Sequence, residues 1–93
     1  MDAVERAIEP LDAPAVVTVR YWAGARAAAG VDVETVSGVG TVAELVARIG
    51  AARPELRAVL AVAAVLVDGR AAAGEDPVGA GALVEVLPPF AGG

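Results

Sequence analysis

The sequence ends in Ala82-Leu83-Val84-Glu85-Val86-Leu87-Pro88-Pro89-Phe90-Ala91-Gly92-Gly93. Apolar and β-branched residues predict a strand up to Leu87, and strand pairing must stop at Pro88 because proline donates no backbone N–H. Glycine at the last two positions leaves the backbone nearly unrestricted. We therefore expect residues 88–93 to form a thin tail on a stiff base, with the carboxylate of Gly93 as its only reactive group. The plainer alternative is a frayed chain end.

A second strand is predicted at residues 16–22, where β-branched and aromatic residues predominate. Side chains alternate between the two faces of a strand, so each strand has one core face and one outer face. The positions predicted to be buried in the two strands are Val17, Val19, Tyr21, Val84 and Val86. The same alternation places Arg20, Trp22, Glu85 and Leu87 on the outer face.

The segments between these strands predict an α+β domain. A capping box, Thr41 with Glu44, and apolar residues at helical spacing predict a helix that Pro54 ends. Asp68-Gly69 is typical of a hairpin turn. The other predictions are a loop at 24–30, a strand at 31–37, a helical turn at 54–60, strands at 62–67 and 70–73, and a loop at 74–81. This order predicts a mixed sheet of four to five strands with one main helix packed across one face.

In the usual arrangement of this order, the first and last strands lie side by side and parallel in the centre of the sheet. Trp22 and Leu87 would then lie at the same end of the sheet, on its outer face, where the tail leaves. An exposed apolar patch beside a protruding tail is a plausible docking site. We hypothesise that Trp22, Leu87 and Phe90 form one such patch. The alternative for Trp22 is ordinary half-buried packing.

The composition argues against a self-sufficient enzyme. The 93 residues suffice for one small domain, carry a net charge of −5 and include no histidine, cysteine or lysine. The usual general bases and nucleophiles are therefore mostly absent, and disulfides and thiolate metal sites are excluded. The lack of a basic patch argues against nucleic-acid binding, and no bilayer-spanning run or secretory signal is evident. We expect a cytoplasmic protein that binds a basic protein surface.

Residues 1–14 are acidic and bounded by Pro10 and Pro14. We interpret them as a flexible N-terminal extension of a domain that spans residues 15–93. A recruitment arm is the alternative interpretation.

Three stretches of the chain resemble the MoaD/ThiS family of ubiquitin-like sulfur carriers, which have the β-grasp fold. They are residues 17–23 with Arg26, residues 41–45 and residues 79–93, and the similarity extends over about residues 16–93. The ending, Pro-Pro-aromatic-small-Gly-Gly, is most similar to that of MoaD, the small subunit of molybdopterin synthase. Trp22 departs from the family, in which phenylalanine is more usual at this position.

The resemblance implies a mechanism in which other proteins perform the catalysis. A MoeB-like enzyme would adenylate Gly93 with ATP and Mg²⁺, and sulfur would then replace the adenylate to give a C-terminal thiocarboxylate. The tail would next enter a MoaE-like large subunit, in an expected heterotetramer, and pass its sulfur to the pterin precursor of molybdopterin. No cofactor and no metal would be bound permanently, and the chain would not be an enzyme by itself.

The resemblance also implies roles for individual residues. Gly93 would carry the adenylate and then the sulfur, and Ala91 and Gly92 would form the narrow part of the tail. The partner-binding residues would be Leu87, Pro88, Pro89, Phe90, Trp22 and Arg26. Arg26 matches a basic residue in the family's loop and would either pair with an acidic group or remain solvated.

Other functions fit the same residues. The carrier could serve the thiazole of thiamine, cysteine or another thiolation pathway. It could also be a ubiquitin-like modifier that forms isopeptide bonds with lysines, or a β-grasp interaction module with an inert tail. The Pro-Pro-Phe sequence before the glycines favours the molybdopterin pathway.

Overall fold

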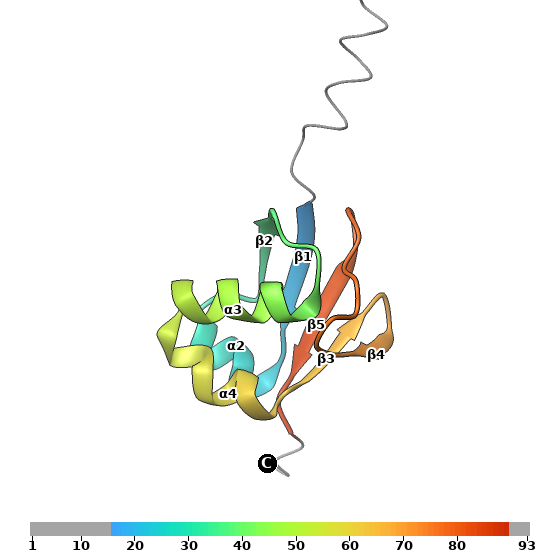
Figure 1. Ribbon diagram of the computed structural model, residues 1–93. Helices are drawn as coiled ribbons and strands as arrows, with labels where there is room; N and C mark the ends of the chain where they lie inside the picture. The colour runs from blue at the N-terminus through green and yellow to red at the C-terminus, as the bar shows by residue number, and fades with distance from the viewer. Residues whose placement is uncertain (1–15, 90–93) are drawn as a thin grey trace, which may run out of the picture.

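The computed structural model describes residues 16–89, which form a mixed sheet with helices on one face (Figure 1). The strands are β1 (Val16–Tyr21), β2 (Val33–Ser37), β3 (Ala64–Val67), β4 (Arg70–Ala72) and β5 (Leu83–Leu87). The helices are α2 (Ala23–Ala29), α3 (Val42–Ala52) and α4 (Arg57–Val62), with a 3-10 turn, η1 (Pro54–Leu56), before α4. No helix in this described range is both long and apolar enough to cross a membrane.

The strand order is β2-β1-β5-β3-β4, so the first and last strands of the chain occupy the centre of the sheet. β1 and β5 are parallel, with Arg20 opposite Glu85 and Tyr21 opposite Val86, whereas the other pairs of strands are antiparallel. The prediction of a parallel central pair is confirmed. Because the final strand is central, its C-terminal end is fixed by neighbours on both sides.

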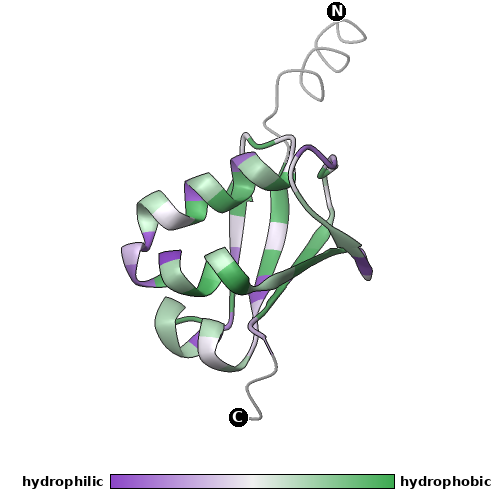
Figure 2. Cartoon of the chain, turned by 60° about the horizontal axis from the view of Figure 1, so that its bottom comes forward, coloured by the Kyte–Doolittle hydropathy of each residue, from purple (hydrophilic) through white to green (hydrophobic). Residues whose placement is uncertain are grey.

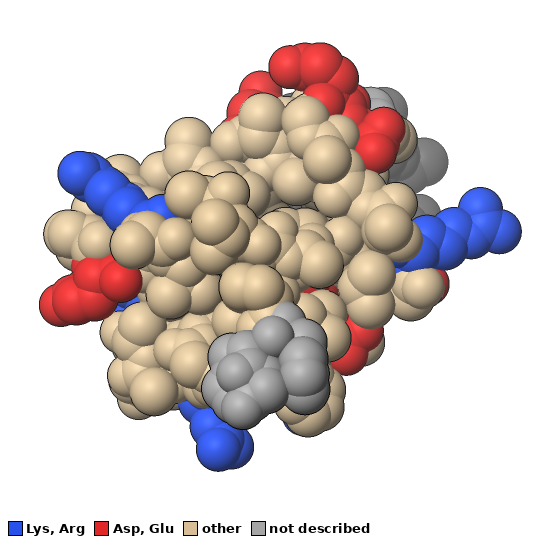
Figure 3. Space-filling view, turned by 90° about the horizontal axis from the view of Figure 1, so that it is seen from below, with Lys and Arg blue, Asp and Glu red and all other residues tan. Residues whose placement is uncertain are grey.

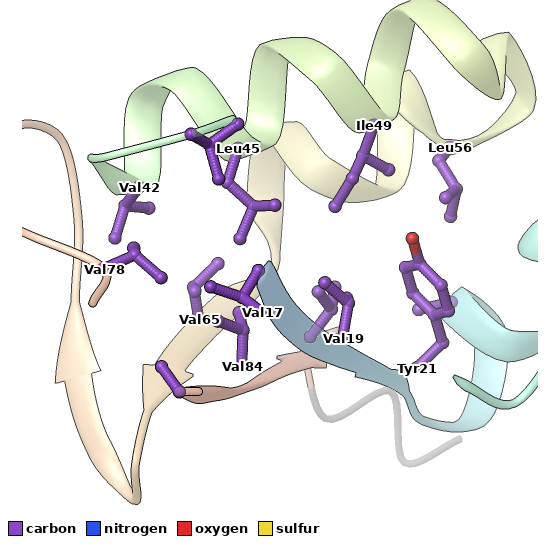
Figure 4. Packing of buried hydrophobic residues seen from close by; sticks show 14 of the residues in the cluster. Val17, Val19, Tyr21, Val42, Leu45, Ile49, Leu56, Val65, Val78 and Val84 are labelled. Atoms are coloured by element: carbon purple, nitrogen blue, oxygen red, sulfur yellow. The ribbon is translucent and has the colours of Figure 1, made fainter. Parts of the chain in front are cut away.

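The core lies between the inner face of the sheet and the helices (Figure 4). All five positions predicted to be buried in β1 and β5 are at most 1% exposed, namely Val17, Val19, Tyr21, Val84 and Val86. The helical layer contributes Val42, Leu45, Ile49 and Leu56. Full burial of each valine or leucine side chain stabilises the fold by about 1.5–3 kcal/mol. Figure 2 shows the ribbon hydrophobic over most of the sheet, with a hydrophilic segment at the β3–β4 hairpin.

The predicted start of the long helix is confirmed. Thr41 is the N-cap of α3, and its side-chain oxygen accepts a hydrogen bond from the backbone N–H of Glu44 at 3.1 Å. The Glu44 carboxylate accepts in return from the N–H of Gly40, one residue before the cap, at 2.6 Å. Two N–H groups at the helix start are thereby satisfied.

The hairpin prediction is also confirmed. Asp68 and Gly69 both have positive φ, 50° and 86°, as the two central residues of a tight hairpin of this hand require. The Asp68 carboxylate accepts from the N–H of Leu83 at 2.9 Å, which ties the turn to the start of β5.

Several predicted boundaries were wrong, and short helices account for most of them. Residues 24–30 are not a loop but belong largely to α2, whose alanines favour a helix and bury Ala25 and Ala29. Gly30 ends this helix with φ of 80°. The second strand begins at Val33 instead of residue 31, and the third begins at Ala64 because Val62 still belongs to α4. The layer over the sheet therefore contains more than one helix, although α3 is the longest.

Candidate functional site

The candidate site is the end of the sheet from which β5 leaves. Pro88, half-buried, and Pro89, exposed, follow Leu87 at this end of the sheet (Figure 1). Phe90 and the three residues after it, Ala91, Gly92 and Gly93, lie outside the described residues. The described part of the tail therefore consists of its rigid base.

Trp22 lies beside this base, as predicted. Its backbone N–H donates to the carbonyl of Val86 at 3.1 Å, so it continues the β1–β5 ladder by one step. Its side chain is 42% exposed, whereas Leu87 is half-buried. The prediction that Trp22 and Leu87 share one end and one face of the sheet is confirmed, and a patch with Phe90 stays a prediction.

The outer face of the sheet carries no described helix, because α2, α3 and α4 all lie on the other side (Figure 1). Strand register arranges its side chains in rows across the sheet. One row consists of Val33, Arg20, Glu85, Leu66 and Ala71. The next row toward the tail contains Trp22, Leu87 and Ala64. This face is therefore continuous with the base of the tail.

Trp22 is held in place by the two charged residues of the neighbouring row. Its indole N–H donates to a carboxylate oxygen of Glu85 at 3.2 Å. The guanidinium carbon of Arg20 lies 5.5 Å from the centre of the indole ring, within the range of a cation–π interaction. Trp22 thus has a defined orientation although it is exposed. Sequence reasoning placed Arg20 and Glu85 on the outer face but did not detect this contact.

Arg26 lies on the exposed side of α2, near the same end of the molecule. Its Nε is 3.6 Å from a carboxylate oxygen of Asp32, and both side chains are mostly exposed. Arg26 is thus close to an acidic group of its own chain and is also largely solvated. An exposed pair of this kind contributes at most about 1 kcal/mol. A contact between Arg26 and a partner stays a prediction.

A polar cluster missed by sequence reasoning lies under the site. The Tyr21 hydroxyl donates to Glu34, and Arg53 donates to both oxygens of Glu34 at 3.0 and 2.9 Å. Arg53 also donates to the carbonyl of Ala29 at 2.7 Å. The hydrogen bonds from Arg53 lower the pKa of Glu34, while burial and the bond to Glu34 raise the pKa of Tyr21. The cluster joins β1, β2 and the C-terminal ends of α2 and α3.

Seen from below, the middle of this surface is mostly uncharged (Figure 3). Arginine, aspartate and glutamate side chains lie toward the periphery of this view. Within residues 16–89, no three His, Cys, Asp or Glu side chains are grouped so that they could hold a metal ion. The described geometry is an exposed sheet face beside the base of the tail.

Comparisons with known proteins agree with this geometry. The model of the ThiS family matches residues 19–93. No curated relative matches the sequence.

Several solved structures share the fold. One, from Pyrococcus furiosus, is described as a putative molybdopterin converting factor, subunit 1. It is 27% identical to this chain with a TM-score of 0.73, and the match covers 81% of this chain and 98% of that chain. Small archaeal modifier protein 1 from Haloferax volcanii is 25% identical with a TM-score of 0.73, and the match covers 84% of this chain and 99% of that chain. A third structure is a complex of subunits 1 and 2 of molybdopterin-converting factor from Helicobacter pylori. The matching chain is 22% identical with a TM-score of 0.64, and the match covers 84% of this chain and 99% of that chain.

The mixed sheet with a parallel central pair is the β-grasp arrangement of these ubiquitin-like proteins, as predicted. The family model covers the chain from the middle of β1 to Gly93 and so includes both Trp22 and the whole tail. The chain belongs to the ThiS family of small ubiquitin-like carrier proteins.

Proposed function

We propose that this chain is a sulfur carrier for molybdopterin synthesis and that Gly93 carries the sulfur as a C-terminal thiocarboxylate. The observation that supports this most is the central position of β5, which delivers Pro88 and Pro89 beside Trp22 and Leu87. A tail anchored in this way leaves the body from a rigid point next to a docking face. Membership of the ThiS family and the likeness to the Pyrococcus furiosus subunit support the same function.

The proposed chemistry takes place at the backbone carboxylate of Gly93. A carboxylate is a poor acyl donor, so one of its oxygens first attacks the α-phosphorus of ATP and displaces pyrophosphate. A sulfur nucleophile at the oxidation level of hydrosulfide then attacks the acyl carbon, and AMP leaves with the original oxygen. The net change is one oxygen replaced by one sulfur. ATP and Mg²⁺ belong to the activating enzyme, and no side chain of the carrier is needed as a base.

The carrier needs two successive partners in this proposal. A MoeB-like enzyme adenylates the tail, and a MoaE-like large subunit receives it for sulfur transfer to the pterin precursor. The Helicobacter pylori structure is described as a complex of the corresponding two subunits, which supports a large-subunit partner here. Leu87 to Phe90 and Trp22 would contact both partners, with Gly92 and Ala91 in the narrow entrance.

The proposal is tested by incubating the purified chain with an adenylating enzyme from the same genome, ATP, Mg²⁺ and a sulfide donor. Intact-mass analysis should detect the adenylate and then the replacement of one oxygen by sulfur. The thiocarboxylated chain, mixed with a MoaE-like subunit and the pterin precursor, should form molybdopterin. If the chain is thiocarboxylated but gives no molybdopterin with that subunit, the carrier function stands and the pathway is another thiolation pathway, such as that of thiazole or cysteine.

A second candidate function is a protein modifier, favoured by the likeness to small archaeal modifier protein 1. In that case the activated carboxyl of Gly93 forms an isopeptide bond with a lysine amine. This chain contains no lysine, so every such bond would join it to another protein. Denaturing affinity capture, digestion with chymotrypsin, which cleaves after Phe90, and peptide mass analysis would identify Ala-Gly-Gly remnants on lysines. A chain that is never activated would instead be an interaction module with an inert tail.

A further inference from the structure

The outer face of the sheet has one charged pair at its centre. Among the outward-facing strand positions in the described residues, Arg20 and Glu85 are charged and the others are apolar or carry a hydroxyl. They are direct neighbours across the parallel strands β1 and β5. On one side lies Val33 and on the other Leu66, so the pair is flanked by apolar side chains.

Arg20 and Glu85 do not form an ion pair with each other. The ion pairs within residues 16–89 join other residues. Trp22 explains the separation, because Arg20 lies over its ring and Glu85 accepts from its indole N–H. A phenylalanine at this position would offer a ring to Arg20 but no donor to Glu85.

Both charged groups keep hydrogen-bonding capacity for a partner. A guanidinium has five N–H donors, and within residues 16–89 Arg20 makes no hydrogen bond with its side chain. Glu85 uses one carboxylate oxygen for Trp22, which leaves the other oxygen to accept. Arg20 is exposed and Glu85 is half-buried, so both are accessible from the outer face.

A partner protein that covered the outer face would remove the charges of Arg20 and Glu85 from water. Such burial is unfavourable unless each charge finds an opposite charge and a hydrogen-bond partner in the complex. A protein that is merely apolar would therefore bind this face poorly, although the surrounding side chains are apolar. The pair consequently favours one kind of partner and rejects others.

We propose that Arg20 and Glu85, held apart by Trp22, determine which protein can dock on the outer face. The inference rests on the proposed function and names the chemistry of the partner surface. The large subunit that receives the tail presents a carboxylate to Arg20 and an arginine or lysine to Glu85. The row containing Trp22 and Leu87 connects this pair to the base of the tail, so docking and tail entry use one continuous surface.

The test measures binding of the full chain to the purified MoaE-like subunit of the same genome by isothermal titration calorimetry. Arg20→Glu and Glu85→Arg each reverse one charge, and Glu85→Gln removes the charge while keeping an acceptor for Trp22. Matched controls are Arg70→Glu on β4 and Glu55→Arg on η1, both exposed and away from the outer face. Circular dichroism spectra and thermal melts establish that each variant is folded.

We expect each reversal at Arg20 or Glu85 to weaken binding at least about tenfold, Glu85→Gln to weaken it less, and both controls to stay within about twofold. Binding of the unmodified chain should also weaken as the salt concentration rises, more steeply than binding of Glu85→Gln. If the unmodified chain binds and the folded reversals bind equally well, this inference is wrong and the proposed function stands. If the unmodified chain does not bind the large subunit at all, the proposed molybdopterin function fails and the inference fails with it.

Discussion

Arg53 and Glu34 form a two-pronged ion pair, in which Nε and Nη2 of Arg53 donate to the two carboxylate oxygens of Glu34 at 3.0 and 2.9 Å. The pair joins the residue that caps the C-terminal end of α3 to the start of β2. Tyr21 donates to the same carboxylate from the end of β1, next to Trp22. The contact therefore supports the end of the sheet at which the candidate site lies.

Arg53→Ala should destabilise the fold by about 2 kcal/mol, because Glu34 would keep its half-buried charge without a cationic partner. The free energy of unfolding, measured by urea titration, checks this value. Arg53→Lys should recover only part of the loss, since an ammonium group cannot make two parallel hydrogen bonds. Arg70→Ala, an exposed arginine on β4, serves as the control and should change stability by less than about 0.5 kcal/mol. Equal effects of the substitutions at residues 53 and 70 would contradict a supporting role for the cluster.

The same pair predicts a pH dependence of stability. Arg53 lowers the pKa of Glu34 below its ordinary value of 4.5 in the folded chain. A carboxyl group with a lowered pKa stabilises the fold fully above its unfolded pKa, and this contribution disappears as the pH falls through the folded pKa. We therefore expect the difference in unfolding free energy between the unmodified chain and Arg53→Ala to shrink below pH 4.5. A difference that stays constant from neutral pH into this acid range would argue against the pairing.

Local patterns predicted the parts of the fold that depend on neighbouring residues. Alternation identified the buried positions of β1 and β5, and Thr41 with Glu44 identified the start of α3. α2 was missed because its buried residues are Ala25 and Ala29, which give little hydrophobic contrast with the alanines around them. Its helical state follows from alanine's high propensity and from packing against β1 and η1.

The contacts that organise the candidate site could not be predicted in this way. Trp22 and Glu85 are 63 positions apart, and Arg53 and Glu34 are 19 positions apart. Each residue taken singly is consistent with a solvated surface side chain. Trp22 meets Glu85 only because β1 pairs with β5. Arg53 meets Glu34 only because the C-terminal end of α3 lies over β2. The sequence did locate Trp22 and Leu87 correctly, because their faces follow from strand alternation and parallel pairing.

Trp22→Ala should weaken binding to the tail-receiving partner by about 2 kcal/mol, a typical effect for an aromatic residue central to an interface. The substitution removes the exposed ring and releases both Arg20 and Glu85. Val16→Ala is a control, since Val16 is 46% exposed at the start of β1, at the end of the sheet away from the tail. Calorimetric titration with the large subunit measures both variants. Unchanged affinity of Trp22→Ala would rule out the patch of Trp22, Leu87 and Phe90.

One residue added after Gly93 should abolish adenylation without changing the fold. The base of the tail is fixed by β5 and Pro88, so the extra residue moves the reacting carboxyl by up to about 3.5 Å relative to the docked body. A displacement of this size takes the carboxylate out of attacking distance of the ATP phosphorus and should lower the adenylation rate at least about a hundredfold. Intact-mass analysis after incubation with the activating enzyme and ATP measures adenylation, and thermal melting should give the same transition for both chains. A chain extended by one residue before Met1 is the control, and it should be adenylated normally because the added residue leaves the carboxylate of Gly93 and its distance from β5 unchanged. Normal adenylation of the chain extended after Gly93 would mean that the partner does not recognise the position of this carboxylate.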